Sequence, residues 1–180
     1  MAIREIIKYG HPVLRMKAKP VEKIDDTINI LVEDMIDTMI AAEGIGLAAT
    51  QVAELVSVCI VNMGLIKEGT PPKAFINPEI LKAEGSCVME EGCLSIPDIR
   101  EKVTRPEKIR VKYLDLGGVA HEEDCDGMLA RVLQHEIDHL NGVLFIDRIS
   151  PMKRKLLSKK LKKIAEESKI QVATTSAGGL

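Results

Sequence analysis

The sequence feature that most constrains this chain is a His-Glu-x-x-His motif formed by His135, Glu136 and His139. Residues four apart on an α-helix share one face, with Cβ atoms roughly 5–6 Å apart, so both imidazoles can bind one metal ion. In such a motif the ion acidifies a water molecule and the glutamate takes its proton. The motif therefore predicts a helix that carries a catalytic metal centre.

The residues around the motif favour a helix independently. Asp126 can cap its start and Gly142 is suited to its end. Apolar side chains recur near the helical period at Met128, Leu129, Val132, Leu133, Ile137 and Leu140. The alternative is a core helix whose histidines only satisfy hydrogen bonds. It is disfavoured, because two histidines and a glutamate in a buried helix are unfavourable without a function.

Length and composition predict one cytoplasmic domain with an aliphatic core. The chain has 180 residues with two Tyr, two Phe and no Trp, so methionine and aliphatic residues must fill the core. We expect residues 1–165 to form a single catalytic domain and residues 166–180 a flexible tail. No apolar run suits a signal peptide or a membrane span. The four cysteines show no disulfide-framework spacing, so each is a buried apolar residue, a ligand or a nucleophile.

The order of predicted elements indicates an α+β fold. A helix is expected over residues 25–43, and a buried strand over residues 56–62. Short strands follow near residues 74–76 and 80–83, then a hairpin whose strands cover residues 109–113 and 119–123. A last helix begins after Ser150 and Pro151, which suit a cap and a first helical position. We therefore expect small antiparallel or mixed sheets around a central metal-binding helix, with helices at both ends.

A catalytic site needs a third protein ligand, and the sequence leaves several candidates. One peptidase class has a histidine at the position of Phe145, and another uses a downstream glutamate, where only Glu166 and Glu167 are available. The peptidase interpretation is therefore weakened. Spacing does not choose among the upstream cysteines Cys87, Cys93 and Cys125. Local context favours Cys93, because it follows a glycine and leaves the Leu94 N–H as a candidate oxyanion donor.

Three motifs together make the chain resemble the bacterial peptide deformylases. The resemblance extends from residues 10–14 to about residue 165. The motifs are Gly44-Ile45-Gly46-Leu47-Ala48-Ala49-x-Gln51, Glu91-Gly92-Cys93-Leu94-Ser95 and Gln134-His135-Glu136-Ile137-Asp138-His139. This resemblance implies a hydrolase that removes the N-formyl group from the initiator methionine of nascent polypeptides and releases formate.

The resemblance also implies a role for each motif residue. Cys93, His135 and His139 bind the metal, and Glu136 is the catalytic acid and base. The side-chain amide of Gln51, which offers donors to a developing oxyanion, and the Leu94 N–H hold that oxyanion. The implied cellular metal is Fe(II), with Zn, Ni or Co able to replace it.

The substrate pocket is inferred in the same way. The methionine side chain needs apolar walls, which the resemblance assigns to Ile45, Met128 and Val132, while Gly46 narrows the site around the small formyl group. Arg131 falls on the same helix face, where some relatives carry an apolar residue.

Charge is distributed unevenly along the chain. Residues 153–180 hold eight Lys or Arg against two Glu, although the net charge of the chain is −2. This basic helix is either a solvated surface helix or a docking site for ribosomal RNA. Two rival functions stay open: a small zinc peptidase, and a metal-stabilised binding module without activity.

Overall fold

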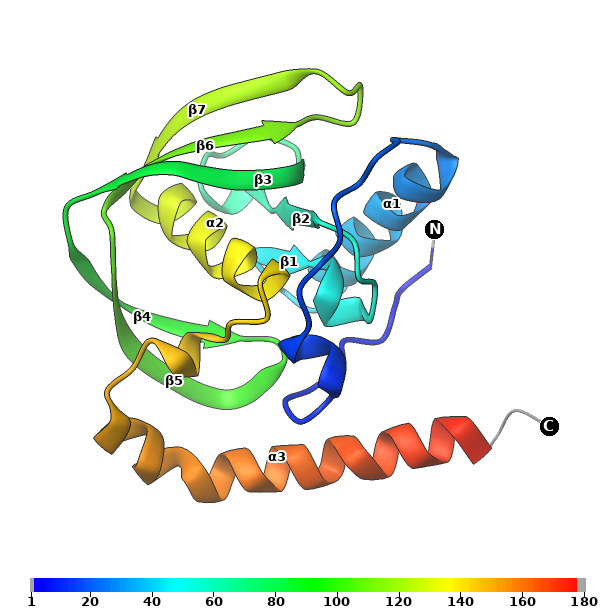
Figure 1. Cartoon of the computed structure of the whole chain (residues 1–180), viewed down its shortest axis with the longest axis vertical. Helices are drawn as coiled ribbons and strands as arrows, with labels where there is room; N and C mark the ends of the chain where they lie inside the picture. Colours follow the sequence, from blue (N-terminus) through cyan, green and yellow to red (C-terminus); the bar gives the residue numbers. More distant parts are fainter. Residues whose placement is uncertain (1, 178–180) are drawn as a thin grey trace.

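The computed structural model describes residues 2–177, with side chains described to residue 170. Five antiparallel strands form one sheet in the order β1-β2-β3-β6-β7, and β4 and β5 form a separate two-stranded ribbon (Figure 1). The strands are β1 Gly46–Ala48, β2 Val58–Val61, β3 Lys73–Glu84, β4 Cys87–Cys93, β5 Ile96–Arg105, β6 Lys108–Leu114 and β7 Ala120–Asp126. The helices are α1 Asp26–Ala41, α2 Gly127–Leu140 and α3 Pro151–Ala177. The predicted α+β class is confirmed.

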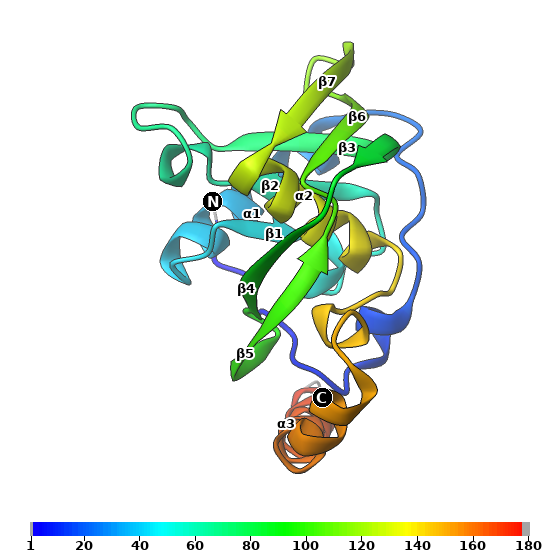
Figure 2. The same cartoon turned by 90° about the vertical axis from the view of Figure 1, so that its left-hand side faces the viewer.

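Helix α2 lies at the centre, between the five-stranded sheet and the β4–β5 ribbon (Figure 2). One face of α2 packs against the sheet. This core cluster includes Ala130, Leu133, Ile137 and Leu140 of α2 with Val61, Phe75 and Val111 of the sheet. Burial of such side chains contributes roughly 1.5–3 kcal/mol each. The polar residues of the motif are thereby held inside the molecule, as a central metal-binding helix requires.

Helix α1 covers β1 and β2 with the methionine-rich core that the composition predicts. Met35 and Met39 are completely buried beside Val58 and Ile60. The helix begins after Asp25, whose carboxylate accepts hydrogen bonds from the N–H groups of residues 27 and 28 at 3.1 and 3.3 Å. Asp25 is therefore the N-cap of α1.

Strand β3 corrects the prediction of two short strands at residues 74–76 and 80–83. The structure has one strand, Lys73–Glu84, whose register against β6 shifts between Ile76 and Glu79 and again between Ile80 and Lys82. Asn77 has a φ of 50°, and its side chain bonds the backbone of Val21. The irregularity breaks the alternation of apolar residues, which is why the sequence suggests a gap.

Helix α2 starts and ends where the sequence predicts, although its N-cap differs in detail. Asp126 occupies the N-cap position without a side-chain capping bond, and it is the last residue of β7, where its backbone is paired with Lys108 of β6. After the helix, Gly142 has a φ of 72° and lies against the Arg15 backbone, where an added Cβ would be 2.6 Å from the carbonyl oxygen. This close approach explains the glycine.

Helix α3 packs along the N-terminal segment and the β4–β5 ribbon. Its first turn is capped by Ser150, whose Oγ accepts the Lys153 N–H at 3.3 Å, and it buries Leu161 and Ile164. The helix continues to Ala177, well beyond residue 165, while residues 178–180 of the expected tail lie outside the described part. Among the described residues, no helix has both the length and the apolar character needed to cross a membrane.

Candidate active site

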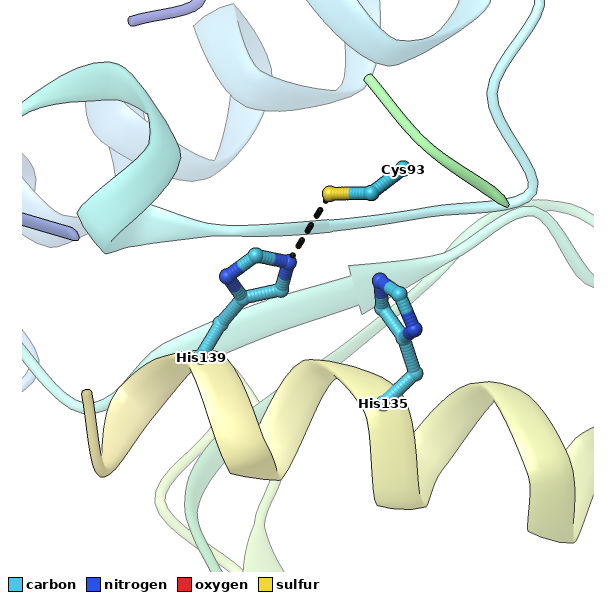
Figure 3. A group of neighbouring side chains, drawn as sticks. All are labelled: Cys93, His135 and His139. Carbon is cyan, nitrogen blue, oxygen red and sulfur yellow. Dashed lines mark hydrogen bonds between the residues drawn. The ribbon is translucent and has the colours of Figure 1, made fainter. Parts of the chain in front are cut away.

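Three potential metal ligands converge where the end of β4 meets α2 (Figure 3). Cys93 ends β4, and His135 and His139 lie one turn apart on α2 with ring centroids 5.0 Å apart. The Cys93 Sγ is 3.2 Å from His139 Nε2. One ligand atom from each residue lies within 4.8 Å of the other two. The fold thus unites the two histidines of the motif with the cysteine that local context favours.

These donors fit a mononuclear catalytic metal site. His135 Nδ1 lies 3.0 Å from Glu91 Oε2, so its Nε2 is left for an ion. Thiolate and imidazole ligands suit zinc and other first-row transition metals. Three protein ligands leave one tetrahedral position open, as catalytic sites do and structural sites do not. Burial lowers the pKa of His139 well below its usual range, which favours the neutral, ligating imidazole.

Glu91 supports the site in a way that sequence reasoning missed. Its buried carboxylate accepts two hydrogen bonds from Arg105, at 2.6 and 3.0 Å, and one from Arg131 at 2.9 Å. Burial raises the pKa of Glu91, but the hydrogen bonds from His135 and Arg105 outweigh it, so the net pKa is well below its usual range. The ionised carboxylate can therefore fix the orientation of the His135 ring.

The same ionic network extends along α2 to Asp138. Arg105 Nη1 donates to Asp138 Oδ2 at 2.7 Å, and Arg148 donates to both oxygens of that carboxylate. Each of these charges is paired, and the pair of Arg105 and Glu91 is buried. Sequence patterns contain no signal for this network, because its members come from β4, β5, α2 and the segment after it.

Glu136 is buried beside the ligands with one oxygen free. Its Oε2 has no hydrogen-bond partner among the described residues, and burial raises the pKa of Glu136 to about 7. Gly46 makes room for the other oxygen, because a Cβ at this glycine would lie 2.5 Å from Glu136 Oε1. A carboxyl group that titrates near neutrality is suited to both accept and donate a proton.

The side-chain amide of Gln51 is oriented with its nitrogen toward the site. Its Oε1 accepts the Ala48 N–H at 2.9 Å, so Nε2 faces Ser95 Oγ at 3.2 Å and Cys93 Sγ at 3.5 Å. The Ala48 N–H is a donor, so the end of the amide that faces it must be the oxygen, and the other end is the NH₂ donor. Leu94 follows Cys93 in the turn between β4 and β5. Both residues thus lie beside the ligands.

A cleft of about 730 Å³ opens beside these groups. Its lining includes every substrate-pocket residue predicted from the sequence, namely Ile45, Gly46, Met128, Arg131 and Val132. Lys8 also lines it, which sequence reasoning missed, since a lone lysine in an irregular segment carries no signal.

Arg131 lines the cleft, but its guanidinium is hydrogen-bonded within the protein. Its side chain is buried, and the guanidinium donates to Glu91 Oε1, to the Val103 carbonyl at 3.0 Å and to the Cys87 carbonyl at 2.7 Å. These bonds tie α2 to both strands of the ribbon.

The fold and site are those of a metal-dependent hydrolase, with a Cys-His-His cluster that could hold the metal ion. The Polypeptide deformylase family model matches residues 3–155, and the chain belongs to this family. It is therefore a metal-dependent hydrolase that removes the N-formyl group from the initiator methionine of nascent polypeptides, with release of formate.

Individual relatives agree over nearly the whole chain. A peptide deformylase from Afipia carboxidovorans is 54% identical over 169 residues, which cover 92% of this chain and 98% of the relative. The crystal structure of a Legionella pneumophila peptide deformylase has a TM-score of 0.84 at 41% identity, covering 95% of this chain and 98% of the other. The Ehrlichia chaffeensis enzyme, solved in complex with actinonin, has a TM-score of 0.84 at 39% identity, covering 91% and 98%.

Proposed function

We propose that Cys93, His135 and His139 hold the metal ion for deformylation and that Glu136 moves the protons. The observation that carries this assignment is the buried, unpartnered Oε2 of Glu136 beside three converging ligands. When bound, a divalent ion polarises the formyl carbonyl and lowers the pKa of a water molecule from about 16 to about 7. No other cluster of three candidate ligands occurs within the described residues.

The carboxylate of Glu136 serves first as a base and then as an acid. It accepts a proton from the attacking water and delivers it to the leaving nitrogen of methionine, which completes cleavage of the formyl–nitrogen bond. Its environment supports both steps, because burial holds its pKa at about 7. Proton transfer by a positioned side chain contributes about 100- to 10,000-fold in rate.

Gln51 Nε2 and the Leu94 N–H stabilise the oxyanion that forms on the formyl oxygen. In the structure Gln51 Nε2 points toward Cys93 Sγ, so its N–H groups are directed at the region where the formyl carbon reacts. Such donors stabilise the transition state by about 2.7–4 kcal/mol each, because they are oriented before the charge develops.

Ile45, Met128 and Val132 form the apolar walls for the methionine side chain, and Gly46 limits the space for the acyl group. Arg131 is compatible with an apolar pocket because its guanidinium is bonded to Glu91 and to two backbone carbonyls of the ribbon. Its charge is thereby neutralised within the protein, and we assign it to the pocket wall.

Fe(II) is the cellular metal that we propose, and Zn, Ni or Co can replace it, because a thiolate and two imidazoles accept all of these ions. Elemental analysis of protein purified anaerobically from cells tests this choice. Iron at one equivalent supports it, and zinc at one equivalent with full activity contradicts it.

Formate release from a formyl-Met peptide tests the assignment of Glu136. The wild type and Glu136→Ala are compared at equal metal content, with an acetyl-Met peptide as the control substrate. We expect formate only from the wild type acting on the formyl peptide. A Glu136→Ala variant that retains the wild-type rate contradicts the proton-transfer role.

We also propose that the enzyme is cytoplasmic and that α3 contacts ribosomal RNA. Its exposed lysines support such contact with an anionic surface, which suits an enzyme acting on emerging chains. Ribosome association should weaken steeply with added salt and on replacement of Lys155, Lys159 and Lys163 by Gln. Association that is insensitive to both changes excludes this role.

The catalytic domain is proposed to end near residue 165. The family match to residue 155 and the contacts of Leu161 and Ile164 with the core support this boundary. Activity that survives removal of residues 166–180 is the expected result, because the contact of Gly10 with Ala165 remains although the hydrogen bond from Ser168 to the Lys8 carbonyl is lost.

A further inference from the structure

Residues 7–9 hold together the two segments that carry the proposed oxyanion donors. The Ile7 N–H donates to the Gln51 carbonyl at 2.9 Å, and the Tyr9 N–H donates to the Ser95 carbonyl at 2.8 Å. Between them, Lys8 Nζ donates to the Leu94 carbonyl at 2.8 Å. One short segment thus bonds the backbone on both sides of the site.

The Lys8 side chain is positioned in the cleft at an energetic cost. It lines the cleft together with Cys93 and Glu136, whereas lysine side chains ordinarily extend into water. Withdrawing an ammonium group from water is unfavourable, so its bond to the Leu94 carbonyl must compensate. A hydrogen bond from a charged donor is roughly twice as strong as one between neutral groups.

The target of that bond is a turn of only two residues. Cys93 pairs directly with Ile96 across the β4–β5 hairpin, so Leu94 and Ser95 alone make the connection. Both carbonyl groups of this turn are held by residues 8 and 9. The Leu94 N–H belongs to the preceding peptide group, between Cys93 and Leu94. It is restrained on one side by the anchored carbonyls and on the other by the pairing of Cys93 with Ile96.

The segment is itself anchored on its far side by α3. The Lys8 carbonyl accepts the Ser168 hydroxyl at 3.3 Å, and an added Cβ at Gly10 would lie 2.7 Å from the Ala165 Cα. The lysine therefore acts from a backbone that is fixed against a helix.

We propose that Lys8 is a positioning residue for deformylation: its ammonium group fixes the Leu94–Ser95 turn and so aims the Leu94 N–H at the oxyanion. The inference rests on the proposed role of the Leu94 N–H and extends it to a residue outside the three sequence motifs. Lys8 contacts the turn and needs no contact with substrate, so its loss should impair turnover more than binding.

Lys8→Met and Lys8→Arg test the proposal, with Lys17→Met as a control at an exposed lysine in the N-terminal region. Each variant is loaded with the same metal, and its metal content, melting temperature, kcat and KM for a formyl-Met peptide are measured. We expect Lys8→Met to lower kcat about 10- to 100-fold, since small misplacements of catalytic groups have effects of this size. KM and metal content should match the wild type. Lys8→Arg should restore most of kcat, and Lys17→Met should be unaffected.

Amide hydrogen exchange of the metal-free protein gives a readout independent of turnover. Lys8→Met should accelerate exchange at Leu94 and Ser95, whereas Lys17→Met should not. Unchanged exchange at these amides overturns the positioning role.

Four kinetic outcomes overturn the proposal or the oxyanion assignment on which it rests. An increase in KM with unchanged kcat means that Lys8 binds the peptide instead. Equal losses of activity and melting temperature in Lys8→Met and Lys8→Arg mean that its role is only structural. If Lys8→Met keeps full kcat while Gln51→Ala is impaired, only the role of Lys8 is overturned. If Lys8→Met and Gln51→Ala both keep full kcat, the oxyanion assignment itself is overturned.

Discussion

At the scale of single residues, Gly46 shows how closely the site is packed around its carboxylate. A methyl group at this position would lie 2.5 Å from Glu136 Oε1 and 2.8 Å from Val132 Cγ1. Gly46→Ala must therefore displace Glu136, and we expect kcat to fall about 100-fold. Metal content should be unchanged, because the ligands are not touched.

Steady-state kinetics and metal analysis check this prediction. Gly117→Ala, in the β6–β7 connection, is the control, since its nearest neighbour is the Asp115 carboxylate at 3.2 Å. Normal turnover by Gly46→Ala would show that Glu136 tolerates the displacement.

Glu91 is the second residue with a specific prediction. Its carboxylate bonds His135 Nδ1 and is in turn held by two arginines. Glu91→Gln weakens the orientation of the imidazole and should lower metal affinity about 10- to 100-fold. Competition with a chelator measures this affinity, with circular dichroism to confirm folding. Glu90→Gln is the matched control, because Glu90 lies at the surface and pairs with Arg100; equal affinities in both variants contradict the prediction.

At the scale of elements, α1 stabilises the fold without taking part in chemistry. Asp25 caps it through two backbone N–H groups. Asp25→Ala should lower the free energy of unfolding by about 1 kcal/mol while kcat stays at the wild-type value. Urea unfolding measures the difference. Asp26→Ala, one position later, should lower the free energy of unfolding by less. A larger loss in Asp26→Ala than in Asp25→Ala would contradict the assignment of Asp25 as the N-cap.

The other elements divide the site between them. Helix α2 supplies the two proposed histidine ligands and Glu136, β4 supplies Cys93 and Glu91, and the short helix after β1 supplies Gln51. The ionic network joins α2 to the ribbon, so the relative position of the ligands is fixed by buried charges as well as by apolar packing.

At the scale of the whole molecule, Asp147 ties the two ends of the fold together. It accepts hydrogen bonds from Arg15, near the start, and from Arg154 in α3. Burial raises the pKa of Asp147, but the hydrogen bonds from Arg15 and from the Leu144 N–H outweigh it, so the net pKa is below its ordinary value of 3.8.

The lowered pKa of Asp147 predicts how the stability of the folded protein depends on pH. A carboxyl group with a lowered pKa in the folded state stabilises it above its ordinary pKa, and the contribution is lost as the pH falls through the folded value. Asp147→Asn should therefore be less stable than the wild type at pH 7, with the difference shrinking below about pH 4. Thermal unfolding of both proteins between acidic and neutral pH tests this prediction. A stability difference between Asp147→Asn and the wild type that stays constant with pH contradicts it.

The sequence by itself determined the part of the site that depends on local periodicity. Two histidines four residues apart must share a face of any helix they occupy, and the apolar stripe of α2 made that helix predictable. The three motifs were sufficient to indicate the family.

The tertiary structure alone decided how distant segments meet. Spacing could not choose Cys93 over Cys87 or Cys125, because its approach to α2 depends on how the β4–β5 ribbon packs. The bonds of Glu91 and Arg131, and the contact of Lys8 with Leu94, likewise join residues far apart in the chain. The physical reason is that the periodicity of side chains along a helix is set within a few residues. Metal ligands converge and buried charges pair only when separate elements pack together.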